Sequence, residues 1–479
     1  MAVLAVALTV AYLIWRAGWT IHGAALWIAL PFLAVEIHNA IGLGVFSLAL
    51  WDVGGPPEPR RSTRSLRVAV LIPTYNEPAA VLLPTIAAAV ALEPAHETWV
   101  LDDGRRPEIR DLAGELGARY LTRTGNEHAK AGNLNHALEQ IDADIVAVLD
   151  SDHVPLPGFL TNTLGYFDDD LIAVVQTPQD FYNVDSFEHE HGGGSGFSEQ
   201  AVFYRAIGPG KNRWNGAFWC GTCALLRTSA LRSVGGVAVG TLTEDIQTTI
   251  RLQRAGWKTV YHNEVLARGL AATDGASYML QRRRWATGAM QVLRIERPMT
   301  APGLRFGQRL AYAATLFAWF DSWRTLAYQL LPIAILLTGC MPVAAPIAVF
   351  GPIAGGVLVL QFVALRLLAR GYYPPLLSLI FEMLRLPAVL PATLTVFTPH
   401  RARAFRVTPK GRIREGDQHA AVPAIYTGLR SLGSFATLWM VATLLGFTPV
   451  HYAHPGAVVG AAVFLAGNQL LIVAAARRL

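Results

Sequence analysis

Long apolar stretches at the two ends of the chain constrain its fold more than any other feature. Residues 1–51 and 308–479 are dominated by apolar side chains, whereas residues 52–307 have the composition of a soluble domain. A helix of about 20 apolar residues crosses a bilayer. Only 15% of the 479 residues are charged, against about 25% in an ordinary soluble protein. We therefore expect a membrane protein with a soluble domain inserted between two membrane portions.

The apolar stretches divide into candidate membrane spans at residues 1–19, 22–50, 312–338, 343–368, 422–446 and 455–475. The second span contains Glu36, His38 and Asn39, which mark either a protein-lined path or a membrane interface. The first residues lack a basic leader and a small-residue cleavage site, so we expect a retained helix and no signal peptide. Lys and Arg gather beside the spans and are absent near 339–342 and 447–454. The positive-inside rule then predicts a cytoplasmic central domain and cytoplasmic termini.

The charge argues against a nucleic-acid-binding protein, and the cysteine content argues against a disulfide or zinc scaffold. The net charge of +6 is modest and its basic residues lie beside apolar segments, so nucleic acid is not an expected partner. Three cysteines give no disulfide framework. Cys220 and Cys223 have CxxC spacing, but no second pair exists to complete a zinc site.

Strands and helices alternate in the central domain. We predict strands at 67–75, 97–103 and 144–152 and helices at 78–92, 107–117 and 128–141. This alternation favours a parallel sheet of βαβ units. Such sheets bind ligands beyond the carboxyl ends of their strands. Asp102, Asp103, Asp150 and Asp152 all fall at predicted strand ends, which indicates a site there.

The segment Asp150-Ser151-Asp152 indicates a divalent cation. Residues i and i+2 of an extended segment point the same way, and two neighbouring carboxylates repel unless a cation lies between them. Mg²⁺ and Mn²⁺ accept one or two carboxylates together with substrate phosphates. A solvated acidic turn is the alternative, but the apolar strand immediately before Asp150 favours the metal site.

Two other acidic motifs are weaker by themselves. Residues 102–104 (Asp-Asp-Gly) close a strand, where a carboxylate can bind a base or ribose and Gly104 permits close approach. Residues 243–245 (Thr-Glu-Asp) open a predicted helix. Thr243 can equally serve as the N-cap of that helix.

A basic motif follows at residues 281–285, Gln-Arg-Arg-Arg-Trp. On a helix, Gln281, Arg284 and Trp285 share one face because they are spaced i, i+3 and i+4. An arginine fork suits a diphosphate, and an indole face suits the C–H surface of a sugar. A basic helix on the membrane surface is the alternative.

In this order the motifs resemble glycosyltransferase family 2 and, within it, the bacterial cellulose synthases. The match runs from about residue 67 to 415 and includes the pattern D, D, D, QxxRW. The segments that carry it are IPTYNEP (72–78), HAKAGNLN (128–135), DSDHVP (150–155), VQTP (175–178), FYNVD (181–185), FWCGT (218–222), TEDIQT (243–248) and FRVTPKG (405–411).

The resemblance implies an α/β, GT-A-like (Rossmann-like) catalytic domain and a role for each motif. Uridine would be held by Thr74, Tyr75, Glu77, Asp102 and Asp103. The diphosphate would meet Lys130 and Asp150, with Mg²⁺ (or Mn²⁺) on Asp150 and Asp152. Asp245 would be the general base, with Glu244 beside it as the other catalytic residue. Diphosphate and acceptor sugar would contact Gln281, Arg284 and Trp285, and the acceptor also Cys220 and Gly221. A gating loop over the nucleotide would include Phe405, Val407, Thr408 and Lys410.

The implied activity is processive, inverting polymerisation of glucose from UDP-glucose into a β-glucan, with β-1,4 linkage favoured. Curdlan-type β-1,3 or mixed linkage is the first alternative, and transfer of one sugar to a lipid acceptor is more distant. A non-catalytic nucleotide-binding scaffold or transporter would not need all the acidic motifs. The expected partners are UDP-glucose, the growing β-glucan and the bilayer of a bacterial inner membrane, with an extracytoplasmic accessory subunit left open.

Three departures from typical cellulose synthases bear on these expectations. Ser151 stands where they usually carry Cys, and only two spans precede the catalytic domain. The chain also ends soon after its last predicted span, without room for a PilZ domain that binds cyclic-di-GMP. We therefore expect an activity that does not respond to cyclic-di-GMP, and the linkage is left open.

The predicted organisation has seven parts. They are N-terminal membrane helices (1–51), a linker (52–66), the catalytic domain (67–270), interfacial helices with QxxRW (271–311), membrane helices (312–370), an interfacial helix with the gating loop (371–419) and C-terminal membrane helices (420–479).

Overall fold

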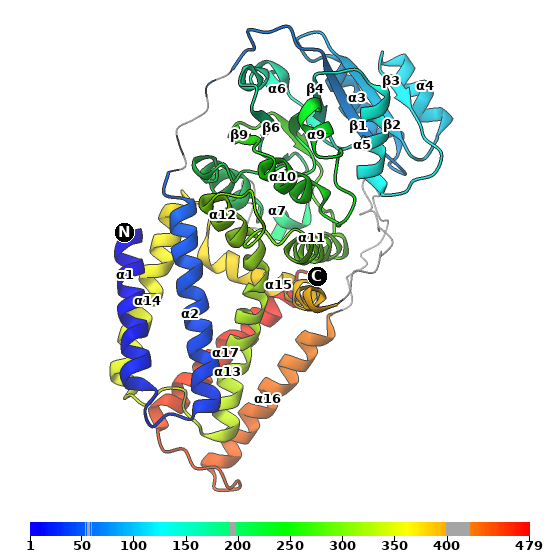
Figure 1. The fold of residues 1–479 in the computed structure, drawn as a ribbon. Coiled ribbons are helices and arrows are strands. Elements are labelled where there is room, and N and C mark those ends of the chain that lie inside the picture. Colours follow the sequence, from blue (N-terminus) through cyan, green and yellow to red (C-terminus); the bar gives the residue numbers. More distant parts are fainter. Residues whose placement is uncertain (53, 55–57, 59, 192–197, 399–421) are drawn as a thin grey trace. The chain divides into compact units, whose positions relative to one another are not determined.

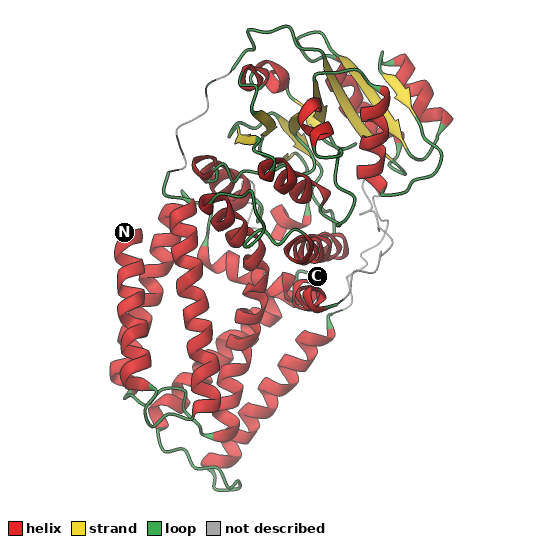
Figure 2. Ribbon diagram, viewed as in Figure 1, coloured by secondary structure: helices red, strands yellow, loops and turns green. Residues whose placement is uncertain are grey.

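The structure is a computed structural model of residues 1–479, and it describes all of them except 53, 55–57, 59, 192–197 and 399–421 (Figure 1). The chain forms two compact units. One unit, here called the helical unit, comprises Met1–Trp51, Phe317–Pro391 and His419–Leu479. The other, here called the central unit, comprises Asp52–Leu316 and Ala392–Gln418. The strands of the described chain all lie in the central unit (Figure 2).

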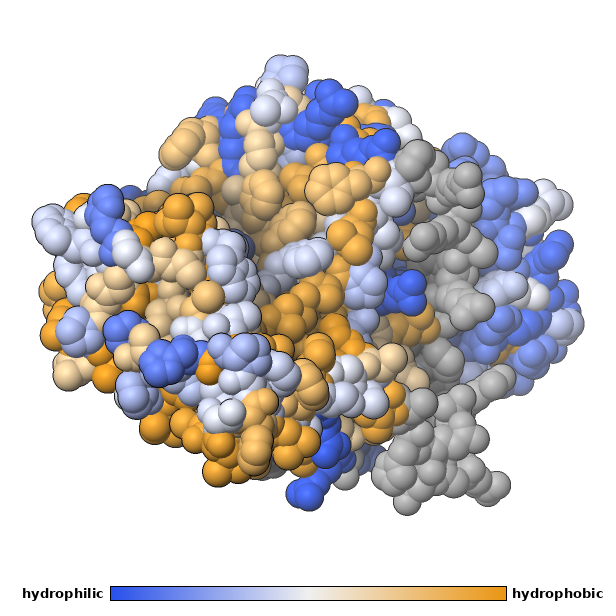
Figure 3. All heavy atoms as spheres, turned by 90° about the horizontal axis from the view of Figure 1, so that it is seen from below, coloured by the Kyte–Doolittle hydropathy of each residue, from blue (hydrophilic) through white to orange (hydrophobic). Residues whose placement is uncertain are grey.

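The helical unit consists of long apolar helices. Its elements are α1 (Ala2–Trp15), a π-helical turn (Arg16–Thr20), α2 (Leu26–Ala49), α13 (Asp321–Thr338), α14 (Ile347–Leu368), α15 (Pro375–Thr393), α16 (Ala424–Leu444) and α17 (Pro455–Ala476). Helix α1 packs against α2 and α14, while α13 packs against α16 and α17. Hydrophobic residues cover much of the face seen from below (Figure 3). Outward-facing apolar residues such as Leu438 and Leu470 are what a helix in lipid requires.

Five helices of the described chain are long and apolar enough to cross a membrane: Ala2–Thr20, Leu26–Ala49, Ile347–Leu368, Pro375–Phe397 and Pro455–Ala476. Four of them coincide with predicted spans. The remaining one, Pro375–Phe397, lies in the segment that we predicted to rest at the membrane–water interface, and it is long and apolar enough to cross a membrane. The predicted span 422–446 is a helix, α16, outside this group.

The predicted span 312–338 is not one helix. It is divided into α12 (Phe306–Phe317), a 3₁₀ turn (Ala318–Phe320) and α13. Asp321 is the first residue of α13, where the partial positive charge of a helix N-terminus favours a carboxylate. The break therefore falls at the one place in this stretch where a new helix start is electrostatically favourable.

The polar residues of α2 face other helices of the same unit. Glu36 is buried, accepts a hydrogen bond from Tyr12 and pairs with Arg16 at 3.0 Å. His38 lies 2.7 Å from Asp321, and the amide of Asn39 donates to the hydroxyl of Tyr328. Of the two interpretations of this trio, protein-lined surroundings fit the structure.

The central unit is built on a mixed seven-stranded sheet in the order β3-β2-β1-β4-β8-β6-β9. Its strands are β1 (Val68–Thr74), β2 (Glu97–Asp102), β3 (Arg119–Leu121), β4 (Ile145–Val148), β6 (Ile172–Gln176), β8 (Ala224–Arg227) and β9 (Lys258–Tyr261). A small sheet combines β5 (Val154–Pro155), β10 (Ala267–Gly269) and β7 (Asp180–Phe181). The helices include α3 (Ala79–Val90), α4 (Pro107–Glu115), α5 (Ala129–Gln140), α6 (Gly158–Thr161), α7 (Phe187–His191), α8 (Gly208–Gly210), α9 (Thr228–Ser233), α10 (Glu244–Arg254) and α11 (Gly275–Ile295).

Strand β1 is buried over its whole length because helices cover both faces of the sheet. Val70 and Ile72 pack on one face in a cluster with Leu82 and Ile86 of α3. The alternate residue Leu71 faces the opposite cluster, which includes α5. The continuous apolar run that predicted a buried strand thus contributes side chains to two hydrophobic cores, one on each face of the sheet.

The predicted α/β alternation is confirmed, and the boundaries of its elements agree to within a few residues. The predicted strands β1, β2 and β4 are parallel, and a further short strand that was not predicted, β3, runs parallel to β2. The expectation of a purely parallel sheet is wrong at β8, which runs antiparallel to both β4 and β6. This reversal brings the chain that precedes β8, residues 218–223, to the same sheet edge as the end of β4.

Candidate active site

The carboxyl ends of three neighbouring strands define the site. Strands β2, β1 and β4 are adjacent and parallel. The segments that leave them begin near Asp102, Thr74 and Asp150, so side chains far apart in sequence meet at one edge of the sheet. The site predicted from the strand ends therefore has the required topology.

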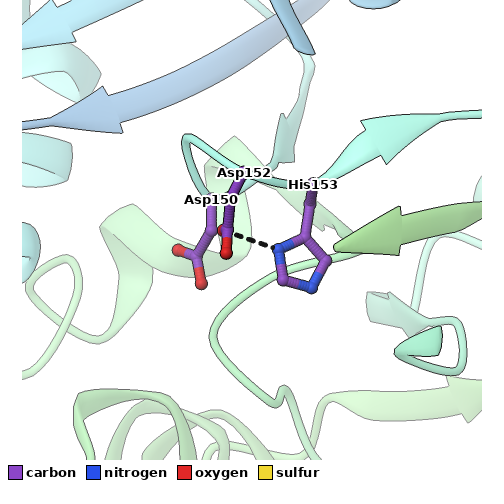
Figure 4. A group of neighbouring side chains, drawn as sticks. All are labelled: Asp150, Asp152 and His153. Carbon is purple, nitrogen blue, oxygen red and sulfur yellow. Dashed lines mark hydrogen bonds and ion pairs between the residues drawn. The ribbon is translucent and has the colours of Figure 1, made fainter. Parts of the chain in front are cut away.

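Asp150, Asp152 and His153 form a group that could hold a metal ion (Figure 4). One ligand atom from each lies within 4.8 Å of the others. Asp152 and His153 are buried, and His153 Nδ1 lies 3.0 Å from Asp152 Oδ1. Two carboxylates and an imidazole fit Mn²⁺ or Mg²⁺, although imidazole is the softer of these ligand types. His153 was missed by the sequence analysis, although it directly follows the DxD motif.

Lys130 connects this group to the loop before β8. Its ammonium contacts Asp150 Oδ1 and donates to the carbonyl oxygen of Gly221 at 2.7 Å. The backbone N–H of Asp150 donates to Thr222 Oγ1 at 2.8 Å. Lys130 lies in the first turn of α5, directly after two left-handed residues, His128 and Ala129. The unusual start of α5 thus places a cation beside the metal group.

Asp245 and Lys130 both lie close to Gly221. A β-carbon on Gly221 would lie 3.3 Å from Asp245 Oδ2 and 3.8 Å from Lys130 Nζ. Gly221 also has φ +84°, a left-handed conformation that favours glycine. The predicted base, the predicted diphosphate-binding lysine and Asp150 are therefore brought together around one glycine.

Burial raises the pKa of Asp245 to about 8, with the charge of nearby Glu244 adding to the shift. The N–H of Ile246 and the ammonium of Lys130 act in the opposite direction. Both acidic residues lie in the first turn of α10. A carboxylate with a pKa near neutrality is a stronger base than an exposed one, which suits general-base chemistry.

Thr243 occupies the N-cap position of α10, as the sequence allowed, but it does not cap the helix with its side chain. A β-carbon added at Gly288 of α11 would lie only 2.5 Å from Thr243 Cγ2. Thr243 is therefore packed against α11 and makes no side-chain capping hydrogen bond.

Two arginines, Arg106 and Arg123, hold the turn after β2 through its acidic residues. Asp102 is fully buried and accepts hydrogen bonds from Gly104 N at 2.9 Å, from Arg106 and from Tyr120. Asp103 pairs with Arg123 at 2.7 Å. The carboxylate of Asp102 thus accepts hydrogen bonds from residues of the protein itself, and these bonds shape the turn. Uridine binding by both residues stays a prediction.

The turn after β1 is tied to the same arginine. Thr74 Oγ1 donates to Glu77 Oε2 at 2.7 Å and accepts from Arg106 Nη2 at 2.9 Å. Tyr75 is partly exposed, and its N–H also donates to Glu77. Gly104 is required because a β-carbon there would lie 2.2 Å from the carbonyl oxygen of Tyr75. The close approach predicted for Gly104 is therefore to the β1 turn, a contact that joins the two turns.

The loop containing Cys220 and Gly221 is held by two glutamines. Gln176, at the end of β6, accepts from Cys220 N at 2.7 Å and donates to the carbonyl of Thr222 at 2.9 Å. Gln179 donates to the carbonyl of Cys220 at 2.9 Å. Burial raises the pKa of the Cys220 thiol, so the thiol is neutral and unsuited to nucleophilic attack. Gln176 lies in the VQTP segment, but its role could not be inferred from sequence.

The motif Gln281–Trp285 lies on α11, and its residues differ in burial. Arg282 is buried, Gln281, Arg284 and Trp285 are half-buried, and Arg283 is exposed. Burial lowers the pKa of Arg284, while the charges of Glu244, Asp150 and Asp245 raise it. These acidic groups are therefore close enough to act on Arg284, and its binding of the diphosphate stays a prediction. A helix lying on a membrane surface would instead expose its arginines.

Two family models match overlapping parts of the chain. Residues 69–235 match the model described as glycosyl transferase family 2, and residues 211–368 match the model described as cellulose synthase. The first match covers β1 to the end of β8, including the metal group. The central unit carries a glycosyltransferase family 2 domain.

Relatives of this glycosyltransferase domain are cellulose synthases. The chain is 40% identical over 304 residues to a cellulose synthase catalytic subunit (UDP-forming) of Xanthomonas axonopodis pv. citri, covering 61% of this chain and 41% of that protein. It is 34% identical over 429 residues to putative cellulose synthase 2 of Komagataeibacter xylinus, covering 86% of this chain and 28% of that protein. The chain thus spans less than half the length of these relatives.

A solved structure supports the fold of the glycosyltransferase domain. The mannosyltransferase PcManGT of Pyrobaculum calidifontis, in complex with GDP-Man and Mn²⁺, matches 76% of this chain and 98% of its own, with a TM-score of 0.54 and 18% identity. The predicted GT-A-like fold is confirmed. The predicted gating residues Phe405, Val407, Thr408 and Lys410 lie outside the described residues.

Proposed function

We propose that this chain is a processive, inverting glycosyltransferase that polymerises glucose from UDP-glucose into a β-glucan and passes it across a bacterial inner membrane. The observation that carries the proposal is that Asp245 and the pair Lys130–Asp150 meet around Gly221. Glycosyl transfer needs a base for the acceptor close to groups that bind the diphosphate of the donor, and these residues supply both.

In this mechanism the acceptor hydroxyl attacks the anomeric carbon of the donor. The new C–O bond forms as the bond between that carbon and the diphosphate oxygen breaks. The acceptor proton passes to the Asp245 carboxylate, and UDP leaves with the bonding electron pair. Attack on the face opposite the α-linked nucleotide gives a β-glycosidic bond.

Charge on the departing UDP is stabilised by groups of this chain. Lys130 and Arg284 supply positive charge near Asp150. Asp150, Asp152 and His153 would hold Mg²⁺ or Mn²⁺, and that ion would supply further charge neutralisation for the diphosphate. Preorganised charges of this kind stabilise a transition state more effectively than water does.

The relatives and the helical unit support the proposed product and its location. The names of the relatives favour a β-1,4 product. A β-1,3 or mixed-linkage product and transfer of a single sugar to a lipid remain the alternatives. Helices long and apolar enough to cross a membrane support a bilayer location, and the basic residues beside them favour a cytoplasmic catalytic domain. An extracytoplasmic accessory subunit is a further proposed partner, which can be added to the assay below.

The decisive experiment incubates the purified chain in lipid nanodiscs with a panel of nucleotide sugars and Mg²⁺ or Mn²⁺. We expect UDP release and an insoluble product from UDP-glucose that a β-1,4-specific glucanase digests. Digestion only by a β-1,3-glucanase would identify the alternative linkage. UDP release with a single-sugar lipid product would contradict processivity, and no turnover of any nucleotide sugar would contradict the enzyme assignment.

A further inference from the structure

A buried charge cluster lies behind the Gln281–Trp285 motif. Arg282, the second residue of that motif, is 2% exposed. Its guanidinium pairs with Glu188 of α7 at 2.7 Å and with Glu199 at 2.6 Å. A buried charge is stable only when it is paired and hydrogen-bonded. The cluster meets this condition, so Arg282 has one defined position.

The two carboxylates are themselves anchored. Glu188 accepts from Ser198 Oγ at 2.8 Å and from Gln200 Nε2 at 2.9 Å. Glu199 accepts from Tyr278 OH at 2.8 Å. Burial acts to lower the pKa of Arg282, but Glu199 and Glu188 outweigh it and raise the pKa above its ordinary value. The guanidinium is therefore held charged and immobile.

The same guanidinium contacts two residues of the predicted acceptor site. Arg282 Nη1 donates to Gln281 Oε1 at 2.9 Å. The Cζ atom of Arg282 lies 4.7 Å from the centroid of the Trp285 ring and 4.5 Å from that of Tyr278. A guanidinium over an aromatic face is attracted to its negative quadrupole. Arg282 thus fixes the amide of Gln281 and covers one face of the Trp285 indole.

We propose that Arg282 is a positioning residue, which orients Gln281 and Trp285 to receive the terminal sugar of the acceptor. The inference rests on the proposed function and deepens it. With its oxygen bound to Arg282, Gln281 presents its NH₂ group as a donor for a sugar hydroxyl. With one indole face covered, the opposite face of Trp285 is the one that stacks on the sugar ring.

Only an arginine satisfies all these contacts together. Its planar fork has five N–H donors in a fixed geometry. Glu188, Glu199 and Gln281 use several of those donors, while the plane stacks on Trp285. A lysine in this place keeps the charge but can neither bridge both carboxylates and Gln281 nor stack as a plane.

The test separates positioning from folding. Replacing Arg282 alone leaves two buried carboxylates without their cation, which can unfold the unit. We therefore combine Arg282→Met with Glu188→Gln and Glu199→Gln, so that no buried charge is left uncompensated. Arg282→Lys is the conservative variant, Trp285→Ala is the reference for a lost acceptor site, and Arg283→Gln is the control that removes an exposed neighbouring charge.

Each full-length variant is assayed for UDP affinity, for hydrolysis of UDP-glucose to glucose and UDP, and for transfer to added cellotetraose. We expect the triple variant to retain UDP affinity and hydrolysis within about two-fold, while its KM for cellotetraose rises about ten-fold, toward that of Trp285→Ala. Arg282→Lys should show an intermediate KM, and Arg283→Gln should match the wild type.

Two results would overturn the inference. One is an unchanged KM for cellotetraose in both the triple variant and Arg282→Lys. The other is a fall of hydrolysis and transfer by the same factor, which indicates a structural role alone. A wild-type chain that turns over no UDP-glucose would instead contradict the proposed function, so the two failures are distinguishable.

Discussion

Asp245 Oδ2 lies 3.3 Å from the position that a β-carbon on Gly221 would occupy. Lys130 Nζ lies 3.8 Å from the same position. Gly221 therefore does more than allow a left-handed backbone, since its missing side chain leaves space beside both the proposed base and the diphosphate-binding lysine.

The first prediction tests that space. Gly221→Ala should abolish polymer synthesis, because the new methyl group crowds the Asp245 carboxylate. Gly235 is a matched control, since it also has φ +84° but has nothing within 4 Å of an added β-carbon. Both variants should lose about 1–2 kcal/mol of unfolding free energy from the strained conformation. Only Gly221→Ala should lose activity, and equal activities of the two variants would contradict the role of the space.

The second prediction concerns the base. Asp245→Asn should retain UDP affinity while synthesis falls by about 10²-fold or more, because only the proton acceptor is removed. Calorimetric UDP binding and radiolabelled product formation measure the two effects. Asp111→Asn, a change at an exposed acidic residue, is the control. Turnover like that of the wild type would remove Asp245 from the mechanism.

The third prediction is a pH dependence of stability. The native pKa of Asp245 is raised from 3.8 to about 8, so between these values the native state binds more protons than the unfolded state. Stability must then fall as pH rises from about 4 to about 8 and level off above that range. Asp245→Asn removes this contribution. We expect its melting temperature, relative to the wild type, to increase with pH, and a constant difference would exclude the raised pKa.

The same pKa predicts the pH dependence of activity. The base must be deprotonated, so kcat/KM of the free enzyme should rise with pH toward about 8. Glu244→Gln removes a neighbouring negative charge and should shift this acidic limb to lower pH. A shift to higher pH would contradict the electrostatic coupling of the two carboxylates.

The fourth prediction concerns the metal. Asp150→Ala should lose activity and the metal-dependent part of UDP affinity. His153→Gln should weaken metal binding if the imidazole belongs to the ligand set and should leave it unchanged if His153 only positions Asp152. UDP binding titrated with and without Mn²⁺ distinguishes the three proteins. Full activity in excess EDTA would contradict the metal assignment.

The last prediction concerns the route of the polymer. Trp323 of α13 is 41% exposed and Trp319 is half-buried in the preceding 3₁₀ turn. If a glucan slides over these rings, Trp323→Ala should shorten the product while hydrolysis of UDP-glucose is unchanged. Trp27→Ala on α2, which also removes an exposed indole, is the matched control. Equal product lengths would favour an interfacial aromatic belt.

Local sequence was sufficient for much of the fold. The apolar run at 68–74 predicts a buried strand because a sheet covered on both faces needs apolar residues at every position. The acidic residues after β2 and β4 predict the site edge because parallel strands end on the same side. Long apolar stretches predict the helices of the helical unit, since a helix satisfies all its backbone hydrogen bonds within one segment in lipid.

Contacts between distant segments decided the rest. The antiparallel direction of β8, the hydrogen bond from Tyr120 to Asp102, and the inward position of Arg282 are not visible in any local pattern. Gly221 meets Lys130 across 91 positions of the chain, and Arg282 meets Glu188 across 94. Sequence determined which residue types lie at the ends of strands and helices, because that depends on periodicity. Only the tertiary structure decided which of them meet, because packing and the pairing of buried charges depend on the whole fold.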